Sequence, residues 1–362
     1  MLVSLPVTAG LLAATLAFPT TTPPAYDPAI DPAGWGNRRL AAQLTVSCVD
    51  MGDLRTARRH ARAGMGGITL LGRRAPGDLR QQLRAVRRSA PGQVRPFVAS
   101  DEEGGTVQRL RTAIYRLPSA RTMGTWSPQR VRRTAYDYAV RMRRLGVRMD
   151  LGPVADLAVR GRYIDDLGRA FHRRPGQVAR RARAWRLGMA DAGVVTVVKH
   201  WPGHGEARNS HTGPARVPPL STLEGRDLVP FERELAGGAE VVMVGHLLAR
   251  GLTRHGVPTS LSPRALRYLR RSAGPDTVVV TDSLAMAAAS SSLGITPARA
   301  AVRSLRAGAD WVMPCDAAPL RAVRAIRRAL DDGTLRRSRA VASARRVLAL
   351  KARWGLAPSA PE

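Results

Sequence analysis

Residues 194–200 read Val194-Val195-Thr196-Val197-Val198-Lys199-His200, an uninterrupted β-prone run that ends on two ionisable side chains. A continuous apolar run is typical of a strand buried on both faces of a parallel sheet, because half-exposed strands alternate apolar with polar residues. Similar short runs recur along the chain, at residues 44–48, 67–71, 96–99, 147–151, 241–244, 277–280 and 311–313. The sequence therefore predicts eight buried parallel strands.

Segments rich in arginine, alanine and leucine separate these runs, and their apolar residues recur at helical spacing. Two such stripes are Val131, Ala135, Tyr138, Met142 and Leu145, and Val178, Ala182, Trp185 and Met189. Strands that alternate with helices eight times predict an α/β fold, a (β/α)₈ TIM-type barrel in a single domain. An open, doubly wound sheet is the alternative fold, although its GxGxxG fingerprint does not follow the first predicted strand.

The charge of the chain is strongly one-sided. Its 362 residues hold 58 Lys and Arg against 27 Asp and Glu, which gives a formal net charge of +31. Lys199 and Lys351 are the two lysines, so 58 − 2 = 56 of the positive charges are arginines scattered over the whole length. We interpret this scatter as a coding bias toward arginine rather than a specific nucleic-acid site, and expect loose association with anionic polymers such as cell walls.

The N-terminus is distinct from the rest of the chain. Leu2–Phe18 is apolar, and Pro19–Pro24 is rich in threonine and proline. This pattern predicts a secretory signal-like leader and an extracellular protein, although no Lys or Arg precedes the apolar run. An uncleaved membrane anchor and a disordered cytosolic tail are the alternatives. The predicted boundaries are a leader and linker over 1–35, one domain over 36–356 and a tail over 357–362.

Polar side chains follow five of the eight runs. They are Asp101-Glu102-Glu103-Gly104-Gly105, Asp156, Lys199-His200, His246 and Asp282. In a barrel of parallel strands, these carboxyl-terminal strand ends meet at one rim, where active sites are built. The sequence therefore predicts a pocket lined by carboxylates and imidazoles.

Three of the seven histidines, His200, His204 and His211, lie within twelve residues. The His200-x₃-His204 spacing resembles that of zinc ligands on a helix. Pro202, Gly203 and Gly205 make a helix unfavourable there, so we interpret the segment as a ligand-binding loop and predict no metal site.

Three blocks of sequence resemble the signature motifs of glycoside hydrolase family 3. They are Asp101–Arg109, Lys199–Gly205 and Val280–Met286. They follow one another in the order of the family, and the similarity extends over about residues 36–355. It is closest to the single-barrel β-N-acetylglucosaminidases of bacterial wall turnover, and it implies a hydrolase that needs no metal or organic cofactor.

The resemblance implies catalytic roles for two residues. Asp282 corresponds to the nucleophile, whose glycosyl ester intermediate makes the reaction retaining. His211, in Asn209-Ser210-His211, corresponds to the general acid/base, which in this subfamily follows an aspartate two residues earlier. Asn209 replaces that aspartate. We expect its side chain to accept the ring N–H of His211 without supplying charge, and Glu206 is the candidate source of the missing charge.

Four further residues correspond to the sugar contacts of the family: Asp101, Arg169, Lys199 and His200. Together these roles imply a secreted, monomeric, retaining β-N-acetylhexosaminidase acting on oligosaccharides or fragments derived from peptidoglycan or chitin. β-Glucosidase-type specificity and a catalytically weakened glycan-binding barrel are the alternatives.

Several residues keep two interpretations each. Cys48 and Cys315 end the first and last strands, which are neighbours in a closed barrel, and either form a disulfide or remain two buried thiols. Trp201 either stacks on a sugar or packs in the core. His246 either bonds the region of the nucleophile or fills the top of the barrel. Asp156 is expected to brace the rim.

Overall fold

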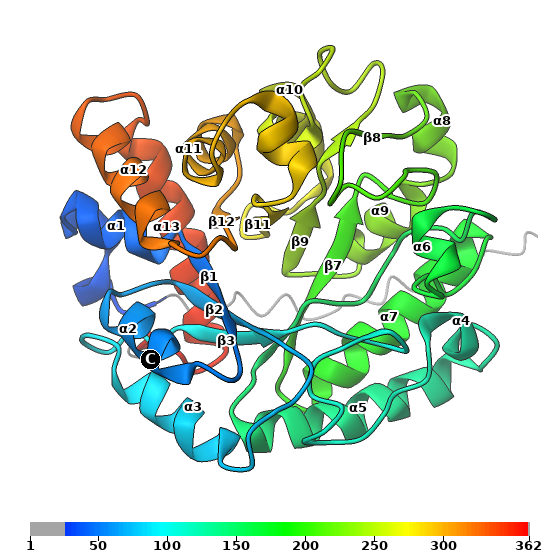
Figure 1. Ribbon diagram of the computed structural model, residues 1–362, viewed down its shortest axis with the longest axis horizontal. Coiled ribbons are helices and arrows are strands. Elements are labelled where there is room, and N and C mark those ends of the chain that lie inside the picture. Colours follow the sequence, from blue (N-terminus) through cyan, green and yellow to red (C-terminus); the bar gives the residue numbers. More distant parts are fainter. Residues whose placement is uncertain (1–25, 361–362) are drawn as a thin grey trace, which may run out of the picture.

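The computed structural model describes residues 26–360, in which eight parallel strands curl into a nearly closed barrel (Figure 1). In sheet order they are β1 (Val46–Asp50), β2 (Gly67–Leu71), β3 (Phe97–Ser100), β6 (Met149–Asp150), β7 (Val195–Trp201), β9 (Val241–Val244), β11 (Val278–Ser283) and β12 (Trp311–Met313). A parallel bridge between Thr45 and Val312 joins the first strand to the last. The predicted (β/α)₈ barrel in a single domain is therefore confirmed, and the doubly wound alternative is wrong.

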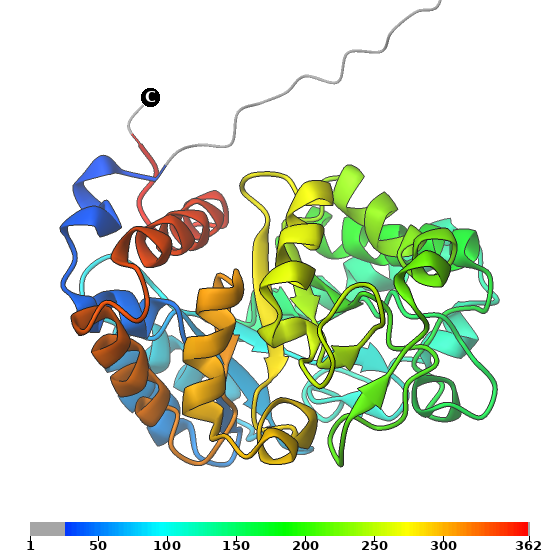
Figure 2. The same cartoon turned by 90° about the horizontal axis from the view of Figure 1, so that it is seen from above.

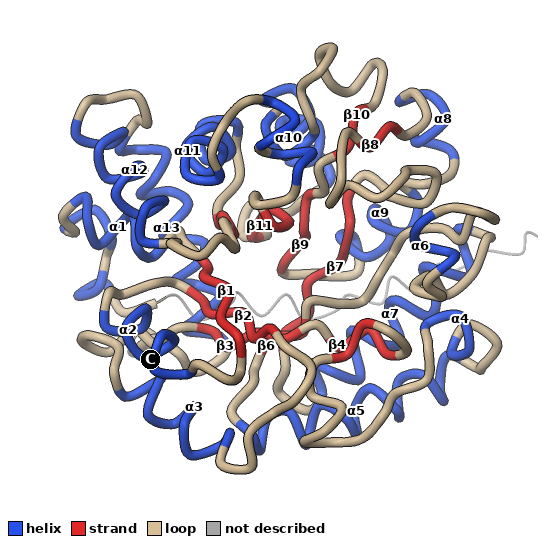
Figure 3. Tube along the Cα trace, viewed as in Figure 1, coloured by secondary structure: helices blue, strands red, loops and turns tan. Residues whose placement is uncertain are grey.

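Helices surround this ring of strands on the outside (Figure 3). The longer ones are α1 (Asn37–Gln43), α2 (Leu54–Arg62), α3 (Leu79–Arg88), α5 (Pro128–Leu145), α7 (Pro175–Asp191), α9 (Val229–Ala236), α10 (Pro263–Ser272), α11 (Pro297–Ala307), α12 (Leu320–Asp331) and α13 (Arg337–Arg353). Short helices are α4 (Ala120–Met123), α6 (Tyr163–Asp166) and α8 (Leu220–Gly225).

The two helical stripes predicted from sequence bury the expected side chains, except that Leu145 is only half-buried. On α5, Val131, Ala135, Tyr138 and Met142 are fully buried against the neighbouring helices and strands. Ser127 caps the start of this helix, and Gly146 ends it in the left-handed conformation that glycine adopts at least cost.

Small elements decorate the rim. Two short sheets are formed by β4 (Glu102–Gly104) with β5 (Val107–Gln108), and by β8 (Ala215–Arg216) with β10 (Leu247–Leu248). Both belong to loops that follow barrel strands, and β4 directly follows β3. The segment from His204 to Thr212 contains no helix, as the glycines and proline predict.

The interior of the barrel is an apolar core that α13 extends. Val46, Phe97, Val241 and Trp311, near the amino-terminal ends of their strands, belong to one buried cluster with Val347 of α13. The base of the barrel is therefore filled, which leaves the carboxyl-terminal rim for a site.

Residues 26–35 pack on α13, beside which they lie in Figure 2. Two 3₁₀ turns, η1 (Pro28–Ile30) and η2 (Pro32–Gly34), are each capped by an aspartate. Asp31 pairs with Arg345 at 2.8 Å, so the packed chain starts before the boundary predicted at residue 36. The apolar leader lies outside the described residues. Within 26–360, no helix is long and apolar enough to span a membrane.

Candidate active site

A cavity of about 290 Å³ opens at the carboxyl-terminal rim of the barrel. Six of the seven predicted site residues line it: Asp101, Arg169, Lys199, His200, His211 and Asp282. They come from strand ends and loops far apart in the chain, and the barrel brings them together because its parallel strands end at one rim. The seventh, Asn209, lies on the loop that carries His211 but is not part of the cavity lining.

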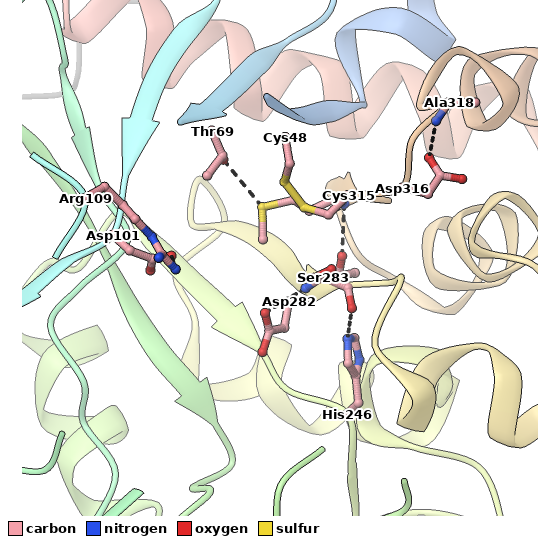
Figure 4. Close-up of a disulfide and its surroundings, with 12 residues drawn as sticks. Cys48, Thr69, Asp101, Arg109, His246, Asp282, Ser283, Cys315, Asp316 and Ala318 are labelled. Carbon is pink, nitrogen blue, oxygen red and sulfur yellow. Dashed lines mark hydrogen bonds and ion pairs between the residues drawn. A yellow bond between two sulfur atoms is a disulfide. The ribbon is translucent and has the colours of Figure 1, made fainter. Parts of the chain in front are cut away.

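Lys199 stands between two carboxylates at the cavity wall. Its Nζ lies 2.6 Å from Asp101 Oδ1 and 2.6 Å from Glu103 Oε1. Arg169 donates from Nε and Nη2 to the two oxygens of Glu103, at 2.7 and 2.8 Å. Arg109 approaches Asp101 at 3.8 Å (Figure 4). These pairs hold Asp101 and Glu103 in place and balance their charge.

The buried pairs change the proton affinity of their members. Burial opposes ionisation of Glu103, but Arg169 and Lys199 outweigh it and lower the pKa of the carboxyl well below its usual range. Burial likewise opposes charge on Lys199, and Asp101 and Glu103 raise the pKa of its ammonium. Glu103, Arg169 and Lys199 are therefore charged at neutral pH.

Asp282 sits at the end of β11, half-buried at the cavity. Its Oδ1 accepts the backbone N–H of Ser283 at 2.7 Å. Burial opposes ionisation, but His200, His246 and this N–H outweigh it and lower the pKa of Asp282 to about 2. Asp282 is thus an ionised carboxylate whose second oxygen, Oδ2, accepts no hydrogen bond from the part of the chain that the structure describes.

His246 supports the backbone next to Asp282. Its Nε2–H donates to the carbonyl of Ser283 at 2.9 Å, and its Nδ1 accepts from Ser260 at 2.7 Å. Figure 4 shows this contact beside the Asp282 carboxylate. The interpretation that His246 bonds the segment around Asp282 is confirmed.

Asp156 braces the end of β7 and the loop that follows. Its Oδ2 accepts from the His200 ring at 2.7 Å, and its Oδ1 accepts the backbone N–H of His204 at 2.7 Å. The Arg169 guanidinium donates to the other ring nitrogen of His200 at 3.5 Å. The bracing role predicted for Asp156 is confirmed, and it fixes the orientation of the His200 ring.

His211 is an exposed residue whose ring lines the cavity, 6.4 Å from the ring of Tyr163. Its carbonyl accepts the backbone N–H of Ala287 at 3.2 Å, which ties this loop to the segment after β11. Loss of water around the ring lowers the pKa of His211 more than the nearby Asp282 raises it.

The expected support of the His211 ring is wrong in two respects. The Oδ1 atom of Asn209 accepts the backbone N–H of His211, at 3.0 Å, rather than the ring N–H. An asparagine two residues before a free N–H forms this local turn readily, which competes with the ring contact. Glu206 pairs with Arg226 at 2.5 Å and so is committed to a different partner.

Glu103 is the main residue that the sequence analysis did not assign. It belongs to the quoted Asp101–Gly105 segment, where Asp101 and Glu103 line the cavity and Glu102 is buried in the core. Side chains along an extended segment point alternately to opposite sides, so residues 101 and 103 point to the same side. This alternation is the sequence signal that groups Glu103 with Asp101.

The cavity wall opposite this charge is rich in sulfur. Cys48 and Cys315 form a disulfide that lines the cavity (Figure 4). Met243, Met286 and Met313 line the cavity as well. Trp201, by contrast, is 2% exposed and packs in an apolar cluster outside the cavity, so it is a core residue. Three His, Cys, Asp or Glu side chains placed to hold one metal ion do not occur within 26–360.

Comparison with known proteins supports the barrel fold. The model of the glycosyl hydrolase family 3 N-terminal domain matches residues 43–350. The solved structure of a family 3 glycosyl hydrolase from Mycobacterium smegmatis has a TM-score of 0.80 at 36% identity, covering 88% of this chain and 98% of that one.

Two curated relatives are named as beta-hexosaminidases. The chain is 42% identical over 229 residues to the beta-hexosaminidase LpqI of Mycobacterium tuberculosis, which covers 59% of this chain and 58% of LpqI. It is 37% identical over 276 residues to a beta-hexosaminidase of Alkalilimnicola ehrlichii, covering 72% and 76% of the two chains. The matched segment thus spans little more than half of LpqI.

Proposed function

The chain belongs to glycosyl hydrolase family 3, and from this premise we propose that it removes terminal β-linked N-acetylglucosamine from glycans. The observation that carries the proposal is the ionised Asp282 carboxylate in one cavity with the paired cluster of Asp101, Lys199 and Arg169. The names of the relatives, beta-hexosaminidases, support the choice of sugar.

In the proposed reaction, Asp282 attacks the anomeric carbon and forms a covalent glycosyl ester. His211 gives a proton to the leaving oxygen and then accepts one from the water that cleaves the ester, so the configuration is retained. Support for Asp282 is its low pKa, since a nucleophile must be ionised before it attacks.

The remaining cluster is proposed to hold the sugar. One oxygen of Asp101 accepts a hydrogen bond from Lys199, and the carboxylate retains lone pairs that can accept hydrogen bonds from sugar hydroxyl groups. Lys199, Arg169 and His200 supply donors from the same wall. Since Glu103 holds both Lys199 and Arg169 in place, these donors are already oriented before the sugar enters, which lowers the entropic cost of binding.

A catalytically weakened glycan-binding barrel is the second candidate. The observation in its favour is that neither Asn209 nor Glu206 bonds the ring of His211, so within residues 26–360 no hydrogen bond to a carboxylate orients this proposed acid/base. β-Glucosidase-type specificity is a third interpretation of the same site.

The net charge of +31 is compatible with association with an anionic wall, where a secreted, monomeric enzyme would meet peptidoglycan or chitin fragments.

The test is turnover of chromogenic β-N-acetylglucosaminide and β-glucoside by the full chain. We expect release of the chromophore from the N-acetyl sugar, and labelling of Asp282 by a fluoro-sugar reagent found by peptide mapping. Sugar binding without turnover would favour the binding barrel. A label on another carboxylate would remove Asp282 from the nucleophile role.

A further inference from the structure

The barrel has one seam, where β1 meets β12. In the strand order these two strands stand at opposite ends of the sheet. Their backbones pair through the Thr45–Val312 bridge, with the N–H of Val312 donating to the carbonyl of Leu44 at 3.0 Å. Within the described chain, no further ladder pairing between β1 and β12 continues toward the rim.

The disulfide lies where this pairing stops. Cys48 and Cys315 each follow the bridged residues Thr45 and Val312 by three positions, so they stand opposite one another in the same parallel register. Their Cα atoms are 4.8 Å apart, the ordinary spacing of adjacent strands. The covalent bond therefore replaces backbone hydrogen bonds on the rim side of the seam.

Cys315 also has an unusual backbone. Its φ of 45° makes it the one residue other than glycine with positive φ within 26–360. Such a conformation is unfavourable for a residue other than glycine and persists where its surroundings impose it. The chain therefore turns sharply at the residue that carries the cross-link.

The end of β12 is coupled to the strand that carries Asp282. The N–H of Leu284 donates to the carbonyl of Met313 at 2.8 Å, and the N–H of Met313 donates to Thr281 Oγ1 at 3.1 Å. Asp282 lies between these two attachment points. A movement of β12 at the seam would consequently displace the end of β11 and its carboxylate.

The disulfide is also part of the cavity wall. Both cysteines line the cavity with Asp101 and Asp282, and Figure 4 shows the sulfur bridge on the side across from Arg109. Loss of the bridge would thus change the wall itself as well as the support of β12.

We propose that the Cys48–Cys315 disulfide completes the barrel at the catalytic rim and forms one wall of the sugar pocket, so that sugar binding and the placement of Asp282 depend on its oxidation. This inference rests on the proposed function. The two cysteines are positioning residues, and no chemistry at the sugar is assigned to them.

Reduction is the first arm of the test. An added dithiol reductant breaks the S–S bond, giving two cysteine thiols while the reductant itself becomes a cyclic disulfide. We expect two titratable thiols to appear, KM to rise about tenfold and kcat to fall, with reversal on reoxidation. Circular dichroism at the assay temperature should show a folded protein throughout.

The second arm uses variants, which also covers a bridge that resists the reductant. Cys48→Ser/Cys315→Ser and Cys48→Ala/Cys315→Ala both remove the cross-link but differ in polarity. Both should show the raised KM and no response to reductant. Unchanged KM and kcat in both variants, or a change in the serine variant alone, would overturn the proposal.

Binding of free N-acetylglucosamine by calorimetry separates this inference from the proposed function. If the oxidised protein binds the sugar more tightly than either variant but hydrolyses no glycoside, the proposed function is wrong. The inference that the disulfide forms a wall of the sugar pocket is then supported. If turnover occurs and affinity and kinetics are the same with and without the bridge, the inference fails alone.

Discussion

Asp282 and His211 face one cavity, and their surroundings act on their protons in different ways. The neighbours of Asp282 lower its pKa to about 2, so it stays ionised. Loss of water lowers the pKa of His211 below its ordinary value of 6.5, so its protonated form is confined to acidic pH. A fixed carboxylate beside a group that titrates is the arrangement that a nucleophile and an acid/base require.

The Asp282 carboxylate has a direct test. Asp282→Asn keeps the size of the side chain and can still accept the Ser283 N–H, but it removes the negative charge of the proposed nucleophile. We therefore expect kcat to fall about 1,000-fold or more. Hydrolysis of a chromogenic β-N-acetylglucosaminide measures this loss. Asp276→Asn, at an exposed position before β11, should keep wild-type activity. A variant that retains a tenth of the rate contradicts the role of Asp282.

The pH dependence of kcat/KM follows from these two groups. In the proposed mechanism, formation of the glycosyl ester needs ionised Asp282 and protonated His211. Since the pKa of Asp282 is about 2 and that of His211 is lowered, kcat/KM should be highest at acidic pH and fall as pH rises through the His211 pKa. A pH–rate profile between pH 4 and 8 checks the sign.

Asn209→Asp tests the missing charge on the loop. A carboxylate at this position would favour the protonated ring, so the falling limb of the kcat/KM profile should move to higher pH by about 0.5–1 unit, with a gain in rate at neutral pH. Asn209→Ser, which adds no charge, is the control and should leave the limb in place. If the limb does not move in the aspartate variant, a carboxylate at position 209 does not act on the His211 ring.

At the scale of elements, a buried network ties the rim to the outer helices. Glu102, at the start of β4, accepts from Tyr138 of α5 at 2.6 Å and from the N–H of Leu110 at 3.1 Å. Asp150 of β6 accepts from Trp185 of α7 at 2.8 Å and from the N–H of Glu102 at 3.1 Å. This network holds the strands on either side of Asp101.

The network predicts a stability that depends on pH. Burial raises the pKa of Glu102 to about 8 and that of Asp150 to about 7. Because both values exceed those of an unfolded chain, about 4, the folded state binds more protons, and its stability falls as pH rises from about 4 toward 8.

Glu102→Gln removes one of these two titrating carboxyl groups. We expect a shallower decline of the melting temperature between pH 5 and 8 than in the wild type, because glutamine does not titrate. Glu232→Gln, on the exposed face of α9, should keep the wild-type slope. An unchanged slope in the Glu102 variant would show that Glu102 is ionised in the folded protein.

At the scale of the whole molecule, charge is distributed unevenly. Lys and Arg outnumber Asp and Glu by 58 to 27 over the chain, yet three carboxylates and three cations line the cavity. They are Asp101, Glu103 and Asp282 with Arg109, Arg169 and Lys199. Arginine is therefore abundant where it is solvated and matched by acids where it is buried, as the cost of burying an unpaired charge requires.

Lys351 is the exception at the base of the barrel. It lies on α13, is 0% exposed, and its Nζ has no hydrogen-bond partner within the described chain. Burial lowers the pKa of this amine well below its usual value. The folded state therefore binds fewer protons than the unfolded one, and Lys351 costs stability at neutral pH, a cost that shrinks as pH rises toward about 10.

Lys351→Met should remove this cost. Methionine has a similar length and no charge, so we expect the free energy of unfolding at pH 7 to rise by about 1–3 kcal/mol. Lys351→Arg, whose charge is permanent, should destabilise the protein. Urea unfolding at pH 7 and 9 measures both, and the stabilisation by methionine should be smaller at pH 9. A methionine variant less stable than the wild type contradicts an unpartnered amine.

The sequence by itself determined the eight strands, the helical stripes and the residues that gather at the rim. Continuous apolar runs, helical spacing and polar strand ends are all encoded within a few neighbouring residues. The parallel direction of the strands then brings Asp101, Lys199 and Asp282 to one end without knowledge of any contact. These features depend on local patterns of neighbouring residues.

Only the tertiary structure decided which residues contact one another. Lys199 shares Asp101 and Glu103, Asn209 serves the backbone of His211, and Cys48 is bonded to Cys315, 267 residues away. Each of these side chains has several partners within reach. Small differences in distance in the packed structure decide which partner it contacts. The energies of hydrogen bonds and ion pairs depend steeply on that geometry, which no local pattern of residues contains.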